Sequence, residues 1–224
     1  MNVHEAVATR RSVRGFLSKP VPTDIISGIL QAAARAPSGG NLQPWRIKVV
    51  SGAALDRLKR IMEARVQEAP DGEASEYAIY PEKLIAPYRD RRFKVGEDLY
   101  GHVGIPRDDK AGRKAWFAKN YQFFGAPMAL FCNVHRTMGP PQWSDMGMFL
   151  QTVMLLLREE GLDSCAQECW AIYPRTIAEF LGTPPEYMLF TGMAIGYADP
   201  DAPANRLATA RAGLDEFAEF IEHP

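Results

Sequence analysis

Residues 10–14 read Arg10-Arg11-Ser12-Val13-Arg14, and residues 36–45 read Ala36-Pro37-Ser38-Gly39-Gly40-Asn41-Leu42-Gln43-Pro44-Trp45. Because side chains alternate in direction along an extended backbone, Arg10, Ser12 and Arg14 would project to the same side. Guanidinium groups bind phosphate through paired, charge-assisted hydrogen bonds, so the first segment is suited to a phosphate monoester. A solvated basic turn after an N-terminal helix is the other explanation of these residues.

The second segment combines unusual backbone freedom with polar side chains. Pro37 restricts the backbone, the two glycines after Ser38 free it, and amide side chains follow at Asn41 and Gln43. Such a loop allows a planar ligand to approach the backbone closely, although a plain helix-to-strand connection uses the same residue types. Occurring together, the two segments favour a ligand site.

The composition indicates a globular chain that binds a small molecule. The chain has 224 residues, of which 46% are apolar, and a formal net charge of −1. It can therefore bury a core, and it has no general attraction for nucleic acid or an anionic membrane surface. Neither a long apolar span nor a secretory signal is found, so we expect a cytoplasmic protein. The spacing of Cys132, Cys165 and Cys169 predicts reduced, mostly buried thiols.

The motifs of several common catalytic sites are missing from the sequence. It contains no dinucleotide-binding glycine fingerprint, no phosphate loop and no Gly-x-Ser-x-Gly. Its histidines, His4, His102, His135 and His223, are scattered without metal-ligand spacing. We therefore name no catalytic residue and no metal ligand. A chain of this kind can still be an enzyme when a cofactor carries the reaction.

Hydrophobic periodicity predicts one domain built from helices and strands. We expect helices at 22–35, 53–68, 81–92, 109–124, 144–160, 174–181 and 214–222, and strands at 46–51, 128–134, 162–166 and 188–197. No linker or repeat divides residues 1–224, which predicts a single α+β domain with a central mixed or antiparallel sheet surrounded by helices. The polar but aromatic stretch at about 71–124 is predicted to be a lid or insertion.

Four segments together resemble a known family. Arg10–Phe16, Pro37–Trp45, Gly161–Glu168 and Gly192–Tyr197 are similar, in that order, to the FMN-dependent nitroreductases, whose relatives include flavin reductases and iodotyrosine dehalogenases. The resemblance covers nearly the whole chain. It implies a nitroreductase-like fold, an intertwined homodimer with FMN at the subunit interface, and NADH or NADPH as the hydride donor.

The resemblance also implies cofactor contacts. Arg10, Arg11, Ser12 and Arg14 would hold the phosphate and ribityl end of FMN, joined by Arg211, with Arg206 as the alternative. The partner subunit would supply Pro37, Ser38, Gly39, Asn41 and Gln43. The isoalloxazine ring would lie beside Gln167 and Glu168, although Ala166 and Cys169 stand where relatives often have Pro and Gly.

The implied activity is electron transfer from NAD(P)H to a nitroaromatic, of the nitrobenzoate type among others, or to a quinone, by a ping-pong mechanism. There are three alternatives: reductive dehalogenation, enone reduction and a non-catalytic flavin sensor. For the dehalogenase, Glu76 and Tyr77 are candidates for a clamp that holds an amino acid. Side chains of the insertion are candidates for contact with an aromatic substrate: Tyr77, Tyr80, Tyr88, Arg92, Tyr100, Phe123 and Phe124.

The predicted helix at 144–160 has a thick apolar face formed by Met146, Met148, Phe149, Val153, Met154 and Leu157. We interpret it as a helix buried in a dimer; the alternative is that it forms the core of a monomer. The C-terminal helix at 214–222 would then be an arm exchanged between subunits.

Overall fold

A four-stranded antiparallel sheet lies at the centre of the computed structural model, which describes residues 1–222. The strands are β1 (Arg46–Ser51), β2 (Met128–His135), β3 (Asp163–Gln167) and β4 (Tyr187–Gly196), in the order β1-β2-β4-β3. A parallel bridge from Ser12 to Ser164 extends the sheet beyond β3. The predicted α+β class with a mixed or antiparallel sheet is confirmed.

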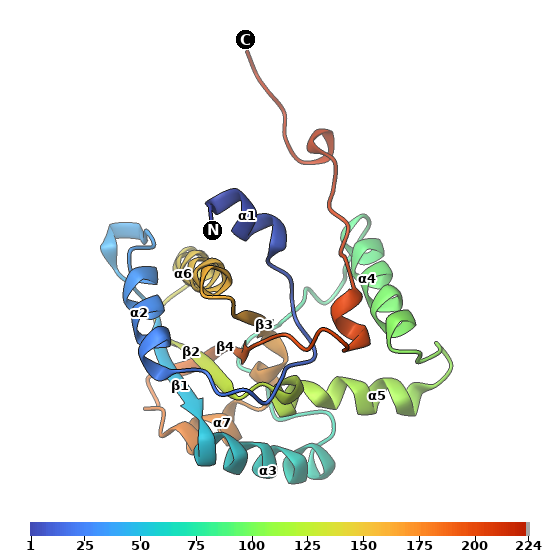
Figure 1. Ribbon diagram of the computed structural model, residues 1–224. Helices are drawn as coiled ribbons and strands as arrows, with labels where there is room; N and C mark the ends of the chain where they lie inside the picture. The colour runs from blue at the N-terminus through green and yellow to red at the C-terminus, as the bar shows by residue number, and fades with distance from the viewer. Residues whose placement is uncertain (223–224) are drawn as a thin grey trace.

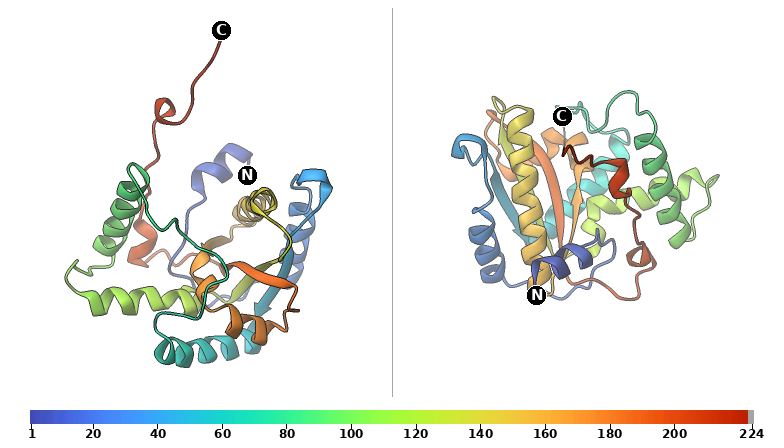
Figure 2. Two further views of the ribbon diagram at one scale, coloured as in Figure 1. Left: turned by 180° about the vertical axis from the view of Figure 1, so that it is seen from behind. Right: turned by 90° about the horizontal axis from the view of Figure 1, so that it is seen from above.

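Helices cover both faces of this sheet (Figures 1 and 2). On one face lie α2 (Thr23–Ala33) and α6 (Pro140–Glu159), with α1 (Val3–Thr9) packed against α6. On the other lie α3 (Gly52–Glu68) and α7 (Pro174–Leu181). Beside them are α4 (Tyr88–His102) and α5 (Lys110–Ala118), and the short turns are η1 (Gly39–Asn41), η2 (Lys119–Gly125), η3 (Glu168–Ile172), η4 (Pro203–Arg206) and η5 (Leu214–Glu216).

The side chains of β2 point alternately to the two faces of the sheet, and the hydrophobic core is divided into two halves by the sheet. Ala129 and Phe131 pack with α3 and α7, whereas Leu130 and Cys132 pack with α2 and α6. Successive side chains of a strand point to opposite faces, and both faces of this strand are covered, so the continuous apolar run is buried throughout. The strand predicted at 128–134 is therefore confirmed.

The end of β3 is held in place by a fully buried tryptophan. Trp170 donates a hydrogen bond from Nε1 to the Gln167 side-chain oxygen at 3.3 Å and stacks on Phe123 with ring centroids 4.6 Å apart. A Cβ atom on Gly192 of β4 would lie 2.4 Å from Trp170 Cδ1. Glycine is therefore required at this position for the indole ring to lie against the sheet.

Three predicted helices differ most from those in the structure. The helix expected at 81–92 begins only at Tyr88, since Pro87 lacks the N–H that a helix interior needs and disfavours helical geometry in the residue before it. The helix expected at 109–124 ends at Ala118, and Phe123 and Phe124 have φ values of 52° and 53°. The C-terminal helix is reduced to the turn Leu214–Glu216.

The interpretation of α6 as mainly a dimer helix also needs correction. Met146, Phe149, Val153 and Leu157 are buried in the core between α6 and the sheet of one chain. Of the predicted apolar face, Met148 remains 39% exposed, while Met154 is half-buried. The expected face is therefore mostly monomer core, because it is the face that covers the sheet.

Candidate functional site

The N-terminal arginine segment runs in extended conformation along the outer edge of β3. The backbone N–H of Val13 donates to the Ser164 carbonyl at 3.0 Å, and the Val13 side chain is fully buried. Because neighbouring side chains alternate, this burial turns Ser12 and Arg14 away from the core. Within residues 1–222, Arg10, Arg11 and Arg14 form no ion pair with a carboxylate.

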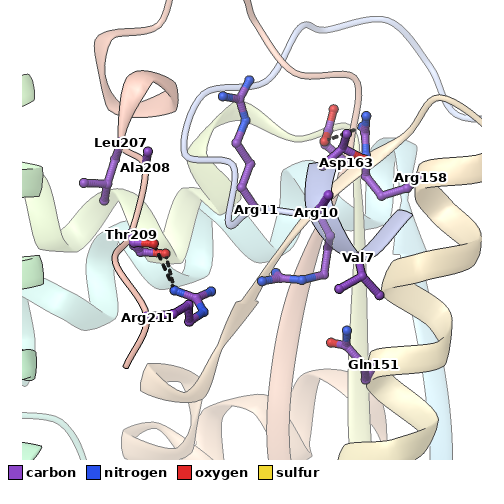
Figure 3. A pocket seen from close by; sticks show the side chains of 12 residues that line it. Val7, Arg10, Arg11, Gln151, Arg158, Asp163, Leu207, Ala208, Thr209 and Arg211 are labelled. Atoms are coloured by element: carbon purple, nitrogen blue, oxygen red, sulfur yellow. Dashed lines mark hydrogen bonds and ion pairs between the residues drawn. The ribbon is translucent and has the colours of Figure 1, made fainter. Parts of the chain in front are cut away.

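A cavity of about 860 Å³ lies between this segment, the C-terminal end of α6 and the C-terminal tail. We call it the arginine cavity; its polar lining residues include Arg10, Arg11, Arg158, Asp163, Thr209 and Arg211. Figure 3 shows Arg10 and Arg211 extending toward one another from two walls, whereas Arg11 points the other way. Arg158 is neutralised by Asp163 at 2.7 Å, so the other three guanidinium groups supply the net positive charge.

A second cavity, of about 480 Å³, lies at the other end of β3. We call it the strand-end cavity; its lining includes Arg14, Tyr80, Arg92, Leu99, Tyr100, Trp116, Phe117, Asn120, Phe124, Ala166, Gln167, Glu168, Cys169 and Leu207. Leu207 also lines the arginine cavity, so the two spaces are neighbours. Asp163 and Gln167 are about 13 Å apart at the usual rise of a strand. A ligand with an anionic end and a planar end fits this arrangement along β3.

The two predicted residues at the strand end are placed differently. Gln167 is buried, and its side-chain amide donates to the Asn120 carbonyl at 2.8 Å while its oxygen accepts from Trp170. Its side chain is thus occupied inside the protein, which leaves the backbone for contact with a ligand. Glu168 lies at the surface of the cavity, and partial desolvation raises the pKa of its carboxyl group.

The loop at 37–43 lies elsewhere, beside the N-terminal half of α6. The backbone N–H of Gly39 donates to the buried Asp145 carboxylate at 3.2 Å, and Gln43 donates from its backbone to Ser38 Oγ at 3.0 Å. Asn41 and Gln43 have φ values of 57° and 50°, a conformation that is uncommon outside glycine. None of the predicted residues Pro37, Ser38, Gly39, Asn41 and Gln43 lines either cavity.

The separation of the two predicted segments follows from the length of α6. Asp145, which contacts the loop, and Arg158, which lines the arginine cavity, are about 20 Å apart at the rise of an α-helix. Within one chain the loop and the arginine cavity therefore do not meet.

The two arginines that are candidates for the C-terminal phosphate ligand lie in different places. Arg211 lines the arginine cavity, and its Nη1 donates to Thr209 and Ala210 of the same tail. Arg206 is exposed in η4 and lines neither cavity. The placement favours Arg211 over Arg206 as the residue that faces the cavity.

Only some of the insertion's candidates for substrate contact line a cavity. Tyr80, Arg92, Tyr100 and Phe124 line the strand-end cavity. Phe123 is fully buried in the core, and Tyr88 lies 60% exposed outside both cavities.

Glu76 and Tyr77, the candidates for an amino-acid clamp, fasten the insertion to the body. The Tyr77 hydroxyl donates to the Phe190 carbonyl, and the Glu76 carboxylate pairs with Arg136 at 2.6 Å. Both polar groups are therefore occupied, which disfavours the dehalogenase alternative.

Asn205 is a positioning residue that the sequence reasoning missed. Its side-chain oxygen accepts from the Arg14 backbone N–H at 2.7 Å, and its nitrogen donates to the Gly15 and Asp199 carbonyls. The side chain is buried, and it joins positions 191 residues apart. No local pattern signals such a contact.

Among residues 1–222, no three His, Cys, Asp or Glu side chains are grouped as metal ligands would be; His223 lies outside the described residues. In the same part of the chain, no helix combines the length and apolar character needed to cross a membrane.

Known proteins resemble the chain over almost its full length. A model of the nitroreductase family matches residues 7–197. The chain is 37% identical over 215 residues to a 4-nitrobenzoate reductase of Pseudomonas putida, which covers 96% of this chain and 93% of that protein. It is 33% identical over 219 residues to a nitrobenzene nitroreductase of Ectopseudomonas oleovorans, covering 98% and 96%.

A solved structure agrees with the sequence comparison. The FMN and NADPH-dependent nitroreductase NfnB from Sphigopyxis sp. strain HMH superimposes with a TM-score of 0.95 at 51% identity, over 98% of this chain and 99% of that one. A match of this extent, in sequence and in fold, shows that the chain belongs to the nitroreductase family.

Proposed function

We propose that this chain is an NAD(P)H-dependent FMN oxidoreductase that reduces nitroaromatic compounds or quinones. The observation that carries the proposal is the pair of cavities along β3, one with unpaired arginines and the other lined by aromatic side chains. Relatives named as nitrobenzene and 4-nitrobenzoate reductases support the same reaction class.

The donor groups of the arginine cavity fit the phosphate of FMN. A phosphate monoester carries about two negative charges near neutral pH, and Arg10 and Arg211 offer facing guanidinium groups without an ion pair, to which Arg11 would add positive charge. Ser12 and Arg14 would hold the ribityl portion along β3, and the backbone at Gln167 and Glu168 would lie beside the ring. Bound FMN would supply the hydride and electron chemistry that no protein side chain provides.

The remaining residues bind and orient the reactants. Tyr100, Phe117 and Phe124 give the strand-end cavity aromatic walls that exclude water and pack against a planar acceptor. NAD(P)H and the acceptor would use this cavity in turn, which corresponds to a ping-pong mechanism. A Mycobacterium smegmatis relative, 31% identical over 98% of this chain, was solved in complex with NADPH. We further propose that the insertion at about 71–124 acts as a lid over this cavity.

We also propose a homodimer in which each subunit presents its loop at 37–43 to its partner's cofactor. Asn41 and Gln43 keep a strained backbone although they line neither cavity of their own chain. Near them, Leu42 is 52% exposed. The C-terminal tail extends away from the body (Figures 1 and 2), and Phe217, Phe220 and Ile221 on it are exposed. A second subunit would cover these apolar surfaces.

The purified protein tests the function directly. We expect a yellow protein whose flavin absorbance is bleached by NADH or NADPH without oxygen and restored by nitrobenzene or a quinone. Colourless protein that FMN does not reconstitute would refute the proposal. A yellow protein that neither nucleotide bleaches would indicate the sensor alternative instead, and halide release from a halotyrosine without nitro reduction would indicate the dehalogenase.

A further inference from the structure

The helix α4, which borders the strand-end cavity, carries one arginine that differs from its neighbours. Arg89 pairs with Asp90 at 2.8 Å, Arg91 with Glu216 at 2.9 Å, and Lys94 with Asp98 at 2.8 Å. Within residues 1–222, Arg92 forms no ion pair. Its charge is therefore available to a ligand.

Arg92 is held in a geometry suited to binding an anion. Its guanidinium carbon lies 4.1 Å from the centre of the Tyr80 ring, and both residues line the strand-end cavity. Stacking uses the face of the guanidinium plane, whereas its N–H donors lie in that plane. A guanidinium group held over a ring in this way can still donate two parallel hydrogen bonds to a carboxylate.

The rest of the cavity defines what such an anion would be attached to. Tyr100, Phe117 and Phe124 are aromatic, and Glu168 lies at the β3 side of the cavity, where it disfavours a second negative charge. An aromatic acid would thus place its ring among the aromatic residues and its carboxylate at the α4 side. Arg14 also lines the cavity, but we have assigned it to FMN.

We infer that Arg92 is a specificity-determining residue that binds the carboxylate of an aromatic acid, so that nitrobenzoates are preferred over neutral nitroarenes. This inference rests on the proposed nitroreductase function and adds to it a substrate class and the residue that selects it. The 2′-phosphate of NADPH shares the same chemistry as an anion for Arg92, and the experiment separates the two.

The first measurement compares substrates that differ only in the carboxylate. For Arg92→Ala we expect kcat/KM with 4-nitrobenzoate to fall about 10- to 100-fold, mainly through KM, because a charged hydrogen-bonded pair is lost. With nitrobenzene we expect a change below about threefold. Arg92→Lys should be intermediate, since it keeps the charge and loses the planar fork. Arg89→Ala, on the same helix but outside the cavity, is the matched control and should change neither value.

The second measurement uses the FMN-loaded protein without turnover. Benzoate added to the oxidised protein should perturb the flavin spectrum at saturation, and Arg92→Ala should weaken its affinity about as much as it lowers kcat/KM with 4-nitrobenzoate. Anaerobic bleaching by NADH and by NADPH is followed in parallel and should be unchanged by the substitution.

Three outcomes would overturn the role of Arg92. The first is an equal loss of kcat/KM with 4-nitrobenzoate and with nitrobenzene in Arg92→Ala. The second is slower bleaching of this variant by NADPH but not by NADH, which would assign the arginine to the 2′-phosphate. The third is an unchanged affinity for benzoate. Wild-type protein that is bleached but reduces neither the two nitro compounds nor a quinone would instead refute the proposed function, while benzoate binding would still decide the role of Arg92.

Discussion

Replacing Arg211 by alanine should weaken FMN binding from the C-terminal side of the arginine cavity. Arg211 has no ion pair within residues 1–222, and only its Nη1 atom is used, in hydrogen bonds to Thr209 and Ala210. Nε and Nη2 therefore remain as donors for a phosphate. The tail is anchored only lightly at this point, so no unfolding is expected from the substitution.

The size of the effect follows from the exposure of the side chain. A hydrogen bond to a charged group contributes about 1.5–3 kcal/mol, and solvent screening at this exposed position favours the lower end of that range. About 1.5 kcal/mol corresponds to roughly a tenfold increase in the Kd for FMN. Adding Arg10→Ala, on the facing wall, should weaken binding further, and the deficit should shrink as salt screens the phosphate.

The assay is a fluorescence titration of apoprotein with FMN at low and high salt. Arg206→Ala removes the same charge from the exposed turn η4, which lines neither cavity, and should change the Kd by less than about threefold. Weakening by Arg206→Ala without an effect of Arg211→Ala would reverse the assignment. Equal weakening by both would mean that only the overall charge of the tail matters.

Two other predictions concern the subunit interface and the sheet. Arg14→Ala and Asn41→Ala should each reduce FMN occupancy. A mixed dimer with one subunit of each kind should regain about half of the occupancy, since one of its two sites would then be intact. If mixing restores no occupancy, both residues belong to the site of the same subunit. Gly192→Ala should lower the free energy of unfolding in urea by about 1–3 kcal/mol because the new Cβ would lie 2.4 Å from Trp170. Gly28→Ala, on the exposed side of α2 with no atom within 4 Å of the new Cβ, should raise it by up to about 1 kcal/mol. Similar effects of the two substitutions would argue against crowding.

Much of the fold was predictable because local patterns and tertiary packing agree. Along β2 a continuous apolar run is buried on both faces, and the arginine segment is extended beside β3. Alternation alone placed Arg10 and Arg14 at one site, whereas in the structure they line different cavities. The C-terminal prediction was wrong for a physical reason. Leu214, Phe217 and Ile221 form an amphipathic pattern, but within one chain they have no surface to pack against, and short helices without packing are unstable in water.

The residues of the arginine cavity were easier to predict from the sequence than those of the strand-end cavity. Arg10, Arg11 and Arg211 gather at one cavity although about 200 residues separate them in the chain. Leu207 was not predictable, because it matters only for lying between two cavities. Tyr77 was misplaced because an aromatic residue has the same sequence signature whether it lines a cavity or anchors a loop through its hydroxyl group.

The exposed ion pair between Arg91 and Glu216 links the helix α4 to the tail that carries Arg211. Thermodynamic linkage makes such a connection reciprocal. If phosphate binding orders the tail, and substrate binding draws α4 over the strand-end cavity, then each ligand raises the affinity for the other by the same factor. The pair is exposed, so this factor is small and falls with salt. An enzyme of this design would lose its cofactor fastest when it has nothing to reduce.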